Sequence, residues 1–338
     1  MSWIGITKAV DIASHLGVLP ETLASARRQR NDVYVKKEIW QAKKGKARKL
    51  CYPHKDCALD IVQRAIKKKC LEGIKLCEAV RGYLKGQHNI NVSQIIAGRE
   101  YVAKIDIKDF HPHIRPELVI KALRSHDLSH PWCRIIAQLA TFENGVPQGA
   151  ATSNHIANVI IDFVLKQGIL RFCQDRNVVV VNFGDDTAFA GNDRARVDEC
   201  VEHAKKVFAL FGLEANSKSS SAEHVGAMRK FIGTSTARAR ADLTRKKYRE
   251  YRKELRAALR TERRLPIHAP IDKTMINSFK GKIAYVRRLN RKKARVLAVI
   301  FFRLCRVARD RTADRGRLLK MVIVPSMPVS LECPFEVV

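Results

Sequence analysis

The chain has 338 residues, of which 46% are hydrophobic and 29% are charged, and this composition excludes an intrinsically disordered chain, a collagen-like chain and a small disulfide-stapled scaffold. Its 64 Lys and Arg against 33 Asp and Glu give a formal net charge of +31, which indicates a polyanionic partner, with nucleic acid as the first candidate. The length predicts a core region with one or two subdomains rather than one small module.

The sequence predicts neither a leader nor a membrane span. Residues 1–8 lack a basic start followed by an apolar run, and no later stretch reaches the roughly 18 consecutive apolar residues that a span needs. We therefore expect a cytoplasmic protein without a membrane partner. The nine cysteines are scattered and form no Cys-x-x-Cys pair, so we expect reduced thiols rather than a disulfide framework or a zinc site.

The N-terminal segments predict helices around one hairpin. Residues 1–30 are expected to form a helical arm of two short helices, the second opened by Pro20. Residues 34–40 alternate apolar and polar side chains and residues 49–52 resume an extended run, so we expect a hairpin with a basic tip. Residues 56–77 then have the apolar spacing of a helix.

Further strands are predicted in the middle of the chain. Residues 101–107 alternate in polarity, and residues 177–183 contain four consecutive valines, typical of a strand buried on both faces. The tight turn at 184–186 leads into a strand at 187–190, which predicts a hairpin with carboxylates at its bend. A helix over 193–211 and a last strand or turn around 231–233 follow.

His126 and His130 have the i, i+4 spacing of a metal-binding helix. Because no third ligand is near them in the sequence, we expect a loop or a helix end at this place rather than a zinc site.

Positive charge is concentrated in the C-terminal part. Residues 229–320 hold 30 Lys and Arg against 7 Asp and Glu, a net +23 of the chain's +31. Tyr248, Tyr251, Leu255 and Leu259 place an apolar stripe on a helix otherwise covered with Arg and Lys. A basic run of this kind is usually a solvated helix face, but so much charge in one subdomain favours phosphate binding.

Three carboxylates lie at the ends of apolar strands, where an unpaired charge is costly to desolvate: Asp106, Asp185 and Asp186. If the two strands are neighbours, the carboxylates converge, and bound Mg²⁺ would remove their repulsion. Two such ions about 3.5 to 4 Å apart would activate a 3′ hydroxyl and stabilise the leaving pyrophosphate. Taken alone, an Asp-Asp pair at a turn is more often a solvated bend or a helix cap than a set of metal ligands. The order of the surrounding sequence motifs therefore decides between these interpretations.

The order of these blocks resembles the reverse transcriptases, and within them the bacterial retron type, over about residues 30 to 290. The matching segments are a fingers-like block at 43–53 and 59–66, motif A at 105–110, motif B at 145–153 with Asn158 after it, motif C at 183–186, motif D at 213–218, a primer-grip region at 231–233 and a thumb block at 276–286.

The resemblance implies an α+β fold: a right-hand polymerase whose fingers and palm, an antiparallel palm sheet flanked by helices, occupy residues 31–237. An N-terminal helical arm at 1–30 would precede the fingers, and a basic helical thumb would follow the palm at 238–320. The sequence assigns no role to the C-terminal tail at 321–338.

The resemblance also assigns roles to residues. Two Mg²⁺ ions, or Mn²⁺, would be held by the three Asp residues together with Ile107, and Lys218 would donate a proton to the departing pyrophosphate. Lys43 and Arg48 would bind the triphosphate, although Lys44 or Lys46 could replace Lys43. The remaining residues expected to bind nucleotide or primer are Phe110, His111, Gln148, Gly149 and Phe183, the last of which could instead be core. The residues expected to bind RNA are Arg245, Lys246, Arg249, Arg252, Lys253, Lys282, Arg287 and Arg288.

Four positions depart from the retron pattern. His111 stands where a second aromatic normally excludes a ribose, which leaves selection of dNTP over NTP open, and Gly184 replaces the usual Ala. Gly-Asp-Asp is also found in RNA-templated RNA polymerases, but the form of motif B at 147–153 favours a reverse transcriptase. Two retron hallmarks are weak, one at 91–95 and one at 231–233.

As a retron enzyme, the protein would use dNTPs and a structured noncoding RNA as template and primer, begin at an internal 2′ hydroxyl, and leave a tethered DNA product. It would act in phage defence with a separate effector protein. Two alternatives remain open: an RNA-binding scaffold with polymerase shape and little synthesis, and another defence-associated reverse transcriptase, untemplated or protein-primed.

Overall fold

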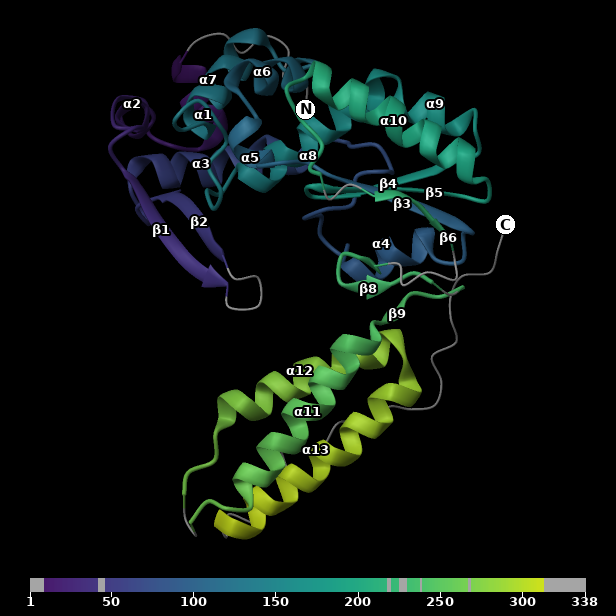
Figure 1. The fold of residues 1–338 in the computed structure, drawn as a ribbon. Helices are drawn as coiled ribbons and strands as arrows, with labels where there is room; N and C mark the ends of the chain where they lie inside the picture. The colour runs from purple at the N-terminus through teal and green to yellow at the C-terminus, as the bar shows by residue number, and fades with distance from the viewer. Residues whose placement is uncertain are drawn as a thin grey trace, which may run out of the picture. The chain divides into compact units, whose positions relative to one another are not determined.

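The computed structural model describes residues 9–41, 46–217, 220–224, 230–237, 239–266 and 269–312. The chain divides between residues 240 and 241 into two compact units (Figure 1). The predicted tail at 321–338 lies outside the described residues. Within those ranges, no helix has the length and apolar character that crossing a bilayer requires.

The N-terminal helices belong to the core of the first unit and do not form a separate arm. They are α1 (Ala9–Leu16) and α2 (Pro20–Arg28), and their Ile12 and Leu23 side chains are buried in the main apolar cluster. The predicted hairpin is confirmed: β1 (Tyr34–Gln41) pairs antiparallel with β2 (Lys46–Pro53).

The helix predicted over 56–77 is too long. It comprises α3 (Ala58–Lys69) and a single turn, η1 (Leu71–Gly73), after which the chain becomes extended. The reason is tertiary, because Val80 forms a bridge with Asn182 and the segment before it must leave the helix to reach that strand. Residues 56–77 contain no proline, but the three lysines at 67–69 followed by Gly73 are a helix stop signal that the prediction did not use.

A four-stranded antiparallel sheet forms the centre of the first unit, which confirms the predicted α+β architecture. The strand order is β4-β5-β3-β6, from β3 (Tyr101–Asp106), β4 (Val179–Phe183), β5 (Asp186–Gly191) and β6 (Ser220–His224). Figure 1 shows α4 and α10 on opposite faces of this sheet. Val179 and Val180 are only half-buried, so the prediction that this strand is buried on both faces was wrong for them, because β4 is an edge strand.

The sheet is enclosed by helices and short strands. These are α4 (Asn89–Ile96), α5 (Phe110–His113), α6 (Pro116–Arg124), α7 (His130–Ala140), α8 (Ser153–Val164), the irregular η2 (Leu165–Ile169), α9 (Leu170–Gln174), α10 (Arg194–Leu210), β7 (Lys230–Phe231) and β8 (Thr234–Ser235). The helix predicted over 193–211 is confirmed as α10, whose first turn is capped by Asp193.

His126 and His130 do not share a helix, because His126 follows α6 and His130 begins α7. His126 Nε2 instead lies 3.1 Å from the buried Asp162 carboxylate, which also accepts hydrogen bonds from Lys166 Nζ at 2.6 Å and the Cys77 amide at 2.5 Å. Burial alone would raise the pKa of Asp162, but the hydrogen bonds from His126, Lys166 and Cys77 outweigh burial and hold that pKa below its usual range.

We expect Asp162→Asn to lower the free energy of unfolding by about 3 kcal/mol, because the change removes the buried negative charge that Lys166 Nζ and the Cys77 amide contact. Since the folded pKa is depressed, this stabilisation is present above the unfolded pKa of about 4 and is lost as the pH falls. Urea denaturation between pH 7 and acid should therefore show a steeper loss in the wild type than in the variant. Glu202→Gln, which breaks an exposed pair with Lys205, should change stability by less than about 1 kcal/mol; equal losses would contradict the assignment.

The second unit is helical, as predicted for the thumb. It begins with the short extended segment β9 (Asp242–Leu243), followed by α11 (Arg245–Glu262), α12 (Lys273–Leu289) and α13 (Arg291–Thr312). Leu255 of the predicted stripe is buried in its core with Phe279 and Leu297.

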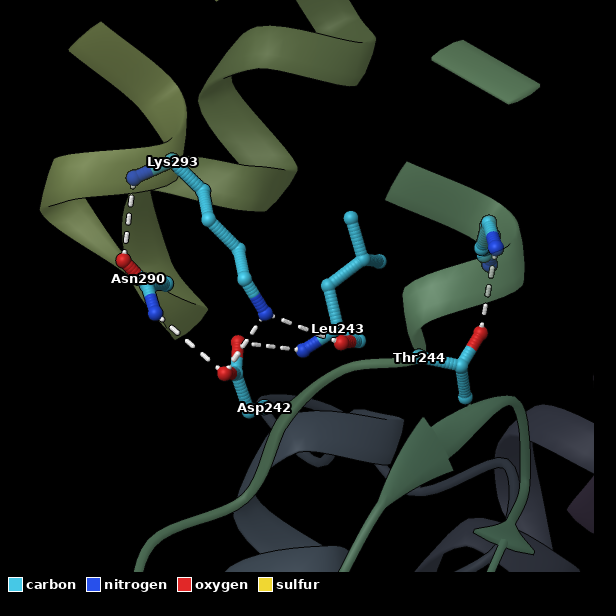
Figure 2. A network of polar contacts seen from close by, with 6 residues as sticks. Asp242, Leu243, Thr244, Asn290 and Lys293 are labelled. Carbon is cyan, nitrogen blue, oxygen red and sulfur yellow. Dashed lines mark hydrogen bonds and ion pairs between the residues drawn. The ribbon is translucent and has the colours of Figure 1, made fainter. Parts of the chain in front are cut away.

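A polar network fixes the start of α11 against α13 (Figure 2). Asp242 accepts hydrogen bonds from Lys293 Nζ at 2.7 Å and Asn290 Nδ2 at 3.2 Å, and Thr244 caps α11 through the Lys247 amide. The entry to the basic helix is therefore fixed within its own unit.

Candidate active site

Strand pairing brings the predicted metal residues together. Asp106 and Asp186 are direct partners in the antiparallel register of β3 and β5, and the Ile107 amide donates to the Asp185 carbonyl oxygen at 3.2 Å. Asn216 donates through its backbone amide to the Asp106 carbonyl oxygen at 2.7 Å. Because partners in register project to the same face of a sheet, residues 106 and 186 share one face beside the turn that carries Asp185.

The fully buried side chain of Asn182 stabilises the turn at motif C by hydrogen bonds. Its side-chain nitrogen, Nδ2, lies 3.0 Å from the Gly184 carbonyl oxygen, 3.2 Å from the Asp186 carbonyl oxygen and 2.9 Å from Thr187 Oγ1. An amide NH₂ has two hydrogens, so these three acceptors share them. Sequence reasoning did not identify Asn182, because only the folded turn shows that its side chain faces back into the hairpin.

Residues 79–82, which sequence reasoning did not assign to the site, lie against the same turn. The Asn182 amide donates to the Ala79 carbonyl oxygen at 2.7 Å, and the Arg81 amide donates to the Asn182 carbonyl oxygen at 3.0 Å. The Gly82 backbone packs so closely on motif C that a Cβ there would lie 2.5 Å from the Gly184 nitrogen. The only local signal was Gly82 itself.

The glycine that departs from the family pattern in motif C has a local explanation. Gly184 has φ +70°, in the left-handed region, and an added Cβ would lie 2.9 Å from Tyr83 Oη and 3.3 Å from its ring. Most L residues disfavour this conformation by roughly 1–2 kcal/mol. Glycine at this position leaves room for the Tyr83 side chain to pack against the turn.

We expect Gly184→Ala to lower the free energy of unfolding and to reduce activity, because the alanine would strain the turn and displace Tyr83. Gly212→Ala is the matched control, since Gly212 has a similar φ of +72° but open space around it. Thermal denaturation should show a loss of about 1 kcal/mol for the control and a larger loss for Gly184→Ala. Equal losses would show that Tyr83 exerts no steric constraint.

Motif A continues directly into contact with motif B. Asp109 adopts φ 41°, and α5 follows with Phe110 and His111 both buried. The Val146 amide of motif B donates to the His111 carbonyl oxygen at 3.1 Å. The backbone at the predicted sugar-binding position is therefore fixed between the two motifs, while contact of His111 with a nucleotide stays a prediction.

Motif B connects the fingers hairpin to the palm. The Cys51 amide of β2 donates to the Gln148 carbonyl oxygen at 2.8 Å, and Gly149 at φ +127° lies against the Cys51 backbone and the Tyr52 ring. On the other side, Asn158 Nδ2 donates to the Gly82 carbonyl oxygen at 2.6 Å. The blocks that sequence reasoning placed in one site are thus joined by hydrogen bonds within the first unit.

The structure does not place every predicted residue. Lys43, Lys44 and Lys218 lie outside the described residues. Arg48 pairs with Ile39 in the hairpin, which places its backbone and not its side chain. Phe183 is half-buried and packs at the edge of an apolar cluster, with its ring centroid 6.1 Å from that of Tyr83, which is consistent with the core interpretation.

The residues fit a divalent metal by ligand chemistry. Two carboxylates in register on adjacent strands, with a third on the neighbouring turn, provide the hard oxygen donors that Mg²⁺ prefers. Among the described side chains, no group of three or more His, Cys, Asp or Glu surrounds a common metal position. The strand register brings the backbones of these residues together, and binding of a common metal ion by their carboxylates stays a prediction.

One face of α11 forms a basic hollow of about 390 Å³ in the second unit. In the described part of the chain, none of its five cations has a carboxylate within salt-bridge distance. Its lining residues are Arg249, Arg252, Lys253, Arg256 and Arg260. The last two were missed by the sequence prediction, although they continue the helical spacing of the first three. We call this surface the α11 basic face.

The other predicted RNA-binding cations differ in environment. Arg245, Lys246, Arg287 and Arg288 are exposed at helix ends. Lys282 is not comparably available, because its Nζ is 2.6 Å from Glu254 and lies over the rings of Tyr251 and Phe279.

Comparisons with known proteins give a consistent result. The model of the family described as reverse transcriptase (RNA-dependent DNA polymerase) matches residues 35–251. The chain is similar to the retron Ec86 reverse transcriptase of Escherichia coli, at 23% identity over 52% of this chain and 54% of that protein. It is also similar to the retron Mx65 reverse transcriptase of Myxococcus xanthus, at 24% identity over 71% of this chain and 58% of that protein. The chain spans about half the length of the curated relatives it matches.

Among solved structures, telomerase from Candida albicans in complex with a fragment of telomeric RNA has a TM-score of 0.46 and 11% identity, over 88% of this chain and 64% of that chain.

Proposed function

Because this chain belongs to the reverse transcriptase family, and within it to the bacterial retron type, we propose that it is an RNA-directed DNA polymerase that copies part of a structured noncoding RNA into DNA. The observation that carries the proposal is the register of β3 and β5, which pairs Asp106 with Asp186 next to the turn bearing Asp185. A two-metal nucleotidyl transferase needs carboxylates close enough to share its metal ions, and this register is compatible with that need.

The residues of the first unit would act together on one nucleotide. Asp106, Asp185, Asp186 and Ile107 would hold two divalent ions, Mg²⁺ or Mn²⁺. When bound, the metal supplies activation of the attacking hydroxyl and stabilisation of the leaving pyrophosphate. The list of other proposed contacts is Lys43 and Arg48 with the triphosphate, Gln148 and Gly149 with the templating and incoming bases, Phe110 and His111 with the sugar, Phe183 with the primer end, and Lys218 as proton donor to pyrophosphate.

The RNA would serve as both template and primer. Synthesis would start from an internal 2′ hydroxyl and use dNTPs, so the DNA product would stay attached to the RNA as msDNA. The α11 basic face would bind an RNA stem through its phosphates and A-form shape rather than through base edges.

The retron type further supports a place in anti-phage defence, with a separate effector protein as partner. The proposal locates the enzyme in the cytoplasm, where RNA templates and dNTPs are available.

Sequencing of the nucleic acid that copurifies with the full chain tests this function. Branched DNA linked to one structured RNA is the expected result. Repetitive DNA without a template would instead indicate another defence-associated reverse transcriptase, untemplated or protein-primed. Tightly bound RNA with neither DNA nor measurable dNTP incorporation would indicate an RNA-binding scaffold, and each of these two results would overturn the proposal.

A further inference from the structure

A strained turn lies on the α4 side of the palm sheet. β7 and β8 form a hairpin in which Phe231 pairs with Thr234, leaving Ile232 and Gly233 as its two-residue turn. Both turn residues have positive φ, 40° at Ile232 and 82° at Gly233. Turns of this kind normally take Asn, Asp or Gly at both positions, and a β-branched residue there is a conformational outlier. Such strain persists only where the surroundings enforce it.

Side chains of α4 enforce this conformation. Asn89 Nδ2 donates to the Ile232 carbonyl oxygen at 3.1 Å. Ser93 Oγ lies 3.4 Å from the Phe231 carbonyl oxygen, and Thr234 Oγ1 lies 2.6 Å from Ser93 Oγ and 2.9 Å from that same carbonyl. Ser93 and Thr234 are both fully buried. The two weak retron hallmark segments, 91–95 and 231–233, are therefore in direct contact.

The same turn packs against the hairpin that carries the carboxylates. Phe231 is buried in one apolar cluster with Val181 of β4 and Ala188 of β5, and Phe183 and Ile232 both pack at the edge of this cluster. The turn and motif C thus share one small core, and a shift in the turn would be transmitted to Phe183, two residues before Asp185.

We propose that Asn89, Ser93 and Thr234 are positioning residues that hold the Ile232–Gly233 turn against motif C and so set where the end of a nucleic-acid primer lies relative to Asp185. This inference rests on the proposed polymerase function. Its specific content is that the hydroxyl of residue 234, rather than the bulk of its side chain, determines the primer position.

Two substitutions of Thr234 separate these contributions in the full-length protein. Thr234→Val removes the hydroxyl at nearly constant volume, and Thr234→Ser keeps the hydroxyl. Well below the melting temperature, we expect Thr234→Val to lower kcat on a primed RNA template about tenfold, with KM for dNTP within about twofold. The reason is that Ser93 Oγ and the Phe231 carbonyl oxygen both lose the Thr234 hydroxyl as a hydrogen-bond partner. Thr234→Ser should restore kcat. Ser93→Ala should resemble Thr234→Val, and the double variant should be no worse than either.

A primer carrying 2-aminopurine at its 3′ end gives a readout that needs no chemistry. We expect its fluorescence in the complex to change in Thr234→Val and to return to the wild-type value in Thr234→Ser. Unchanged fluorescence, or a kcat as low in Thr234→Ser as in Thr234→Val, overturns the positioning role. A wild-type protein that incorporates no dNTP contradicts the proposed function instead, and the fluorescence then decides the positioning role by itself.

Discussion

Asp185→Asn is expected to reduce dNTP incorporation on a primed RNA template on the order of a thousandfold, the largest effect of any single change considered. The substitution keeps size and hydrogen-bonding capacity but removes the charge that a divalent ion needs. The backbone carbonyl oxygen of Asp185 accepts a hydrogen bond from the Ile107 amide, and this bond does not depend on the side chain. The local fold should therefore persist in the variant. Primer extension with Mg²⁺ and dNTPs measures the effect.

Asp193→Asn is the matched control for this change. Asp193 caps α10 by accepting a hydrogen bond from the Arg196 amide at 3.2 Å, and asparagine caps helices equally well. The control should retain wild-type incorporation and stability. Activity that survives Asp185→Asn would refute the assignment of this carboxylate to the metal site.

Replacing Arg249, Lys253, Arg256 and Arg260 with glutamine is expected to reduce the salt dependence of RNA binding. Each lost phosphate contact lowers the slope of log K against log salt by about 0.7 to 0.9, so four contacts predict a decrease of about 3. These cations have no carboxylate partner among the described residues and lie on one helical face, so each is available for a phosphate. Filter binding or fluorescence anisotropy between 50 and 200 mM salt measures the slope.

Four cations of α10 provide a control with the same change in net charge: Arg194, Arg196, Lys205 and Lys206. Three of them already pair with carboxylates on their own helix or at its cap. Changing all four to glutamine should leave the slope nearly unchanged. If both sets lower the slope equally, overall charge attracts the RNA and the α11 basic face has no specific role.

Local pattern was sufficient to predict the elements that position the carboxylates. Alternation at 101–107 and the valine run before Gly184 identified β3 and β4, and the hairpin at 34–53 followed from its alternation. The same reasoning predicted that Asp106 and Asp185 would come together. The register pairs Asp106 with Asp186, the residue after Asp185, and the sharing of metal ions by these carboxylates stays a prediction.

Long-range contacts are what local pattern could not supply. α3 ends early because the segment that follows it carries Val80, which forms a bridge with Asn182. No local pattern within residues 56–77 predicts this pairing. The support of motif C by Asn182, and of the 231–234 turn by Ser93, depends on residues far apart in sequence. Arg256 and Arg260 are a different case, since helical spacing from Arg249 would have identified them.

Counting the divalent ions bound by the protein is the most direct test of whether Asp106, Asp185 and Asp186 share them. Mn²⁺ titration by electron paramagnetic resonance, with primed RNA and an unreactive dNTP analogue present, should give about two ions for the wild type and for Asp193→Asn. Asp106→Asn and Asp185→Asn should each bind fewer or bind them more weakly. Unchanged Mn²⁺ stoichiometry and affinity in both variants would contradict a shared metal site.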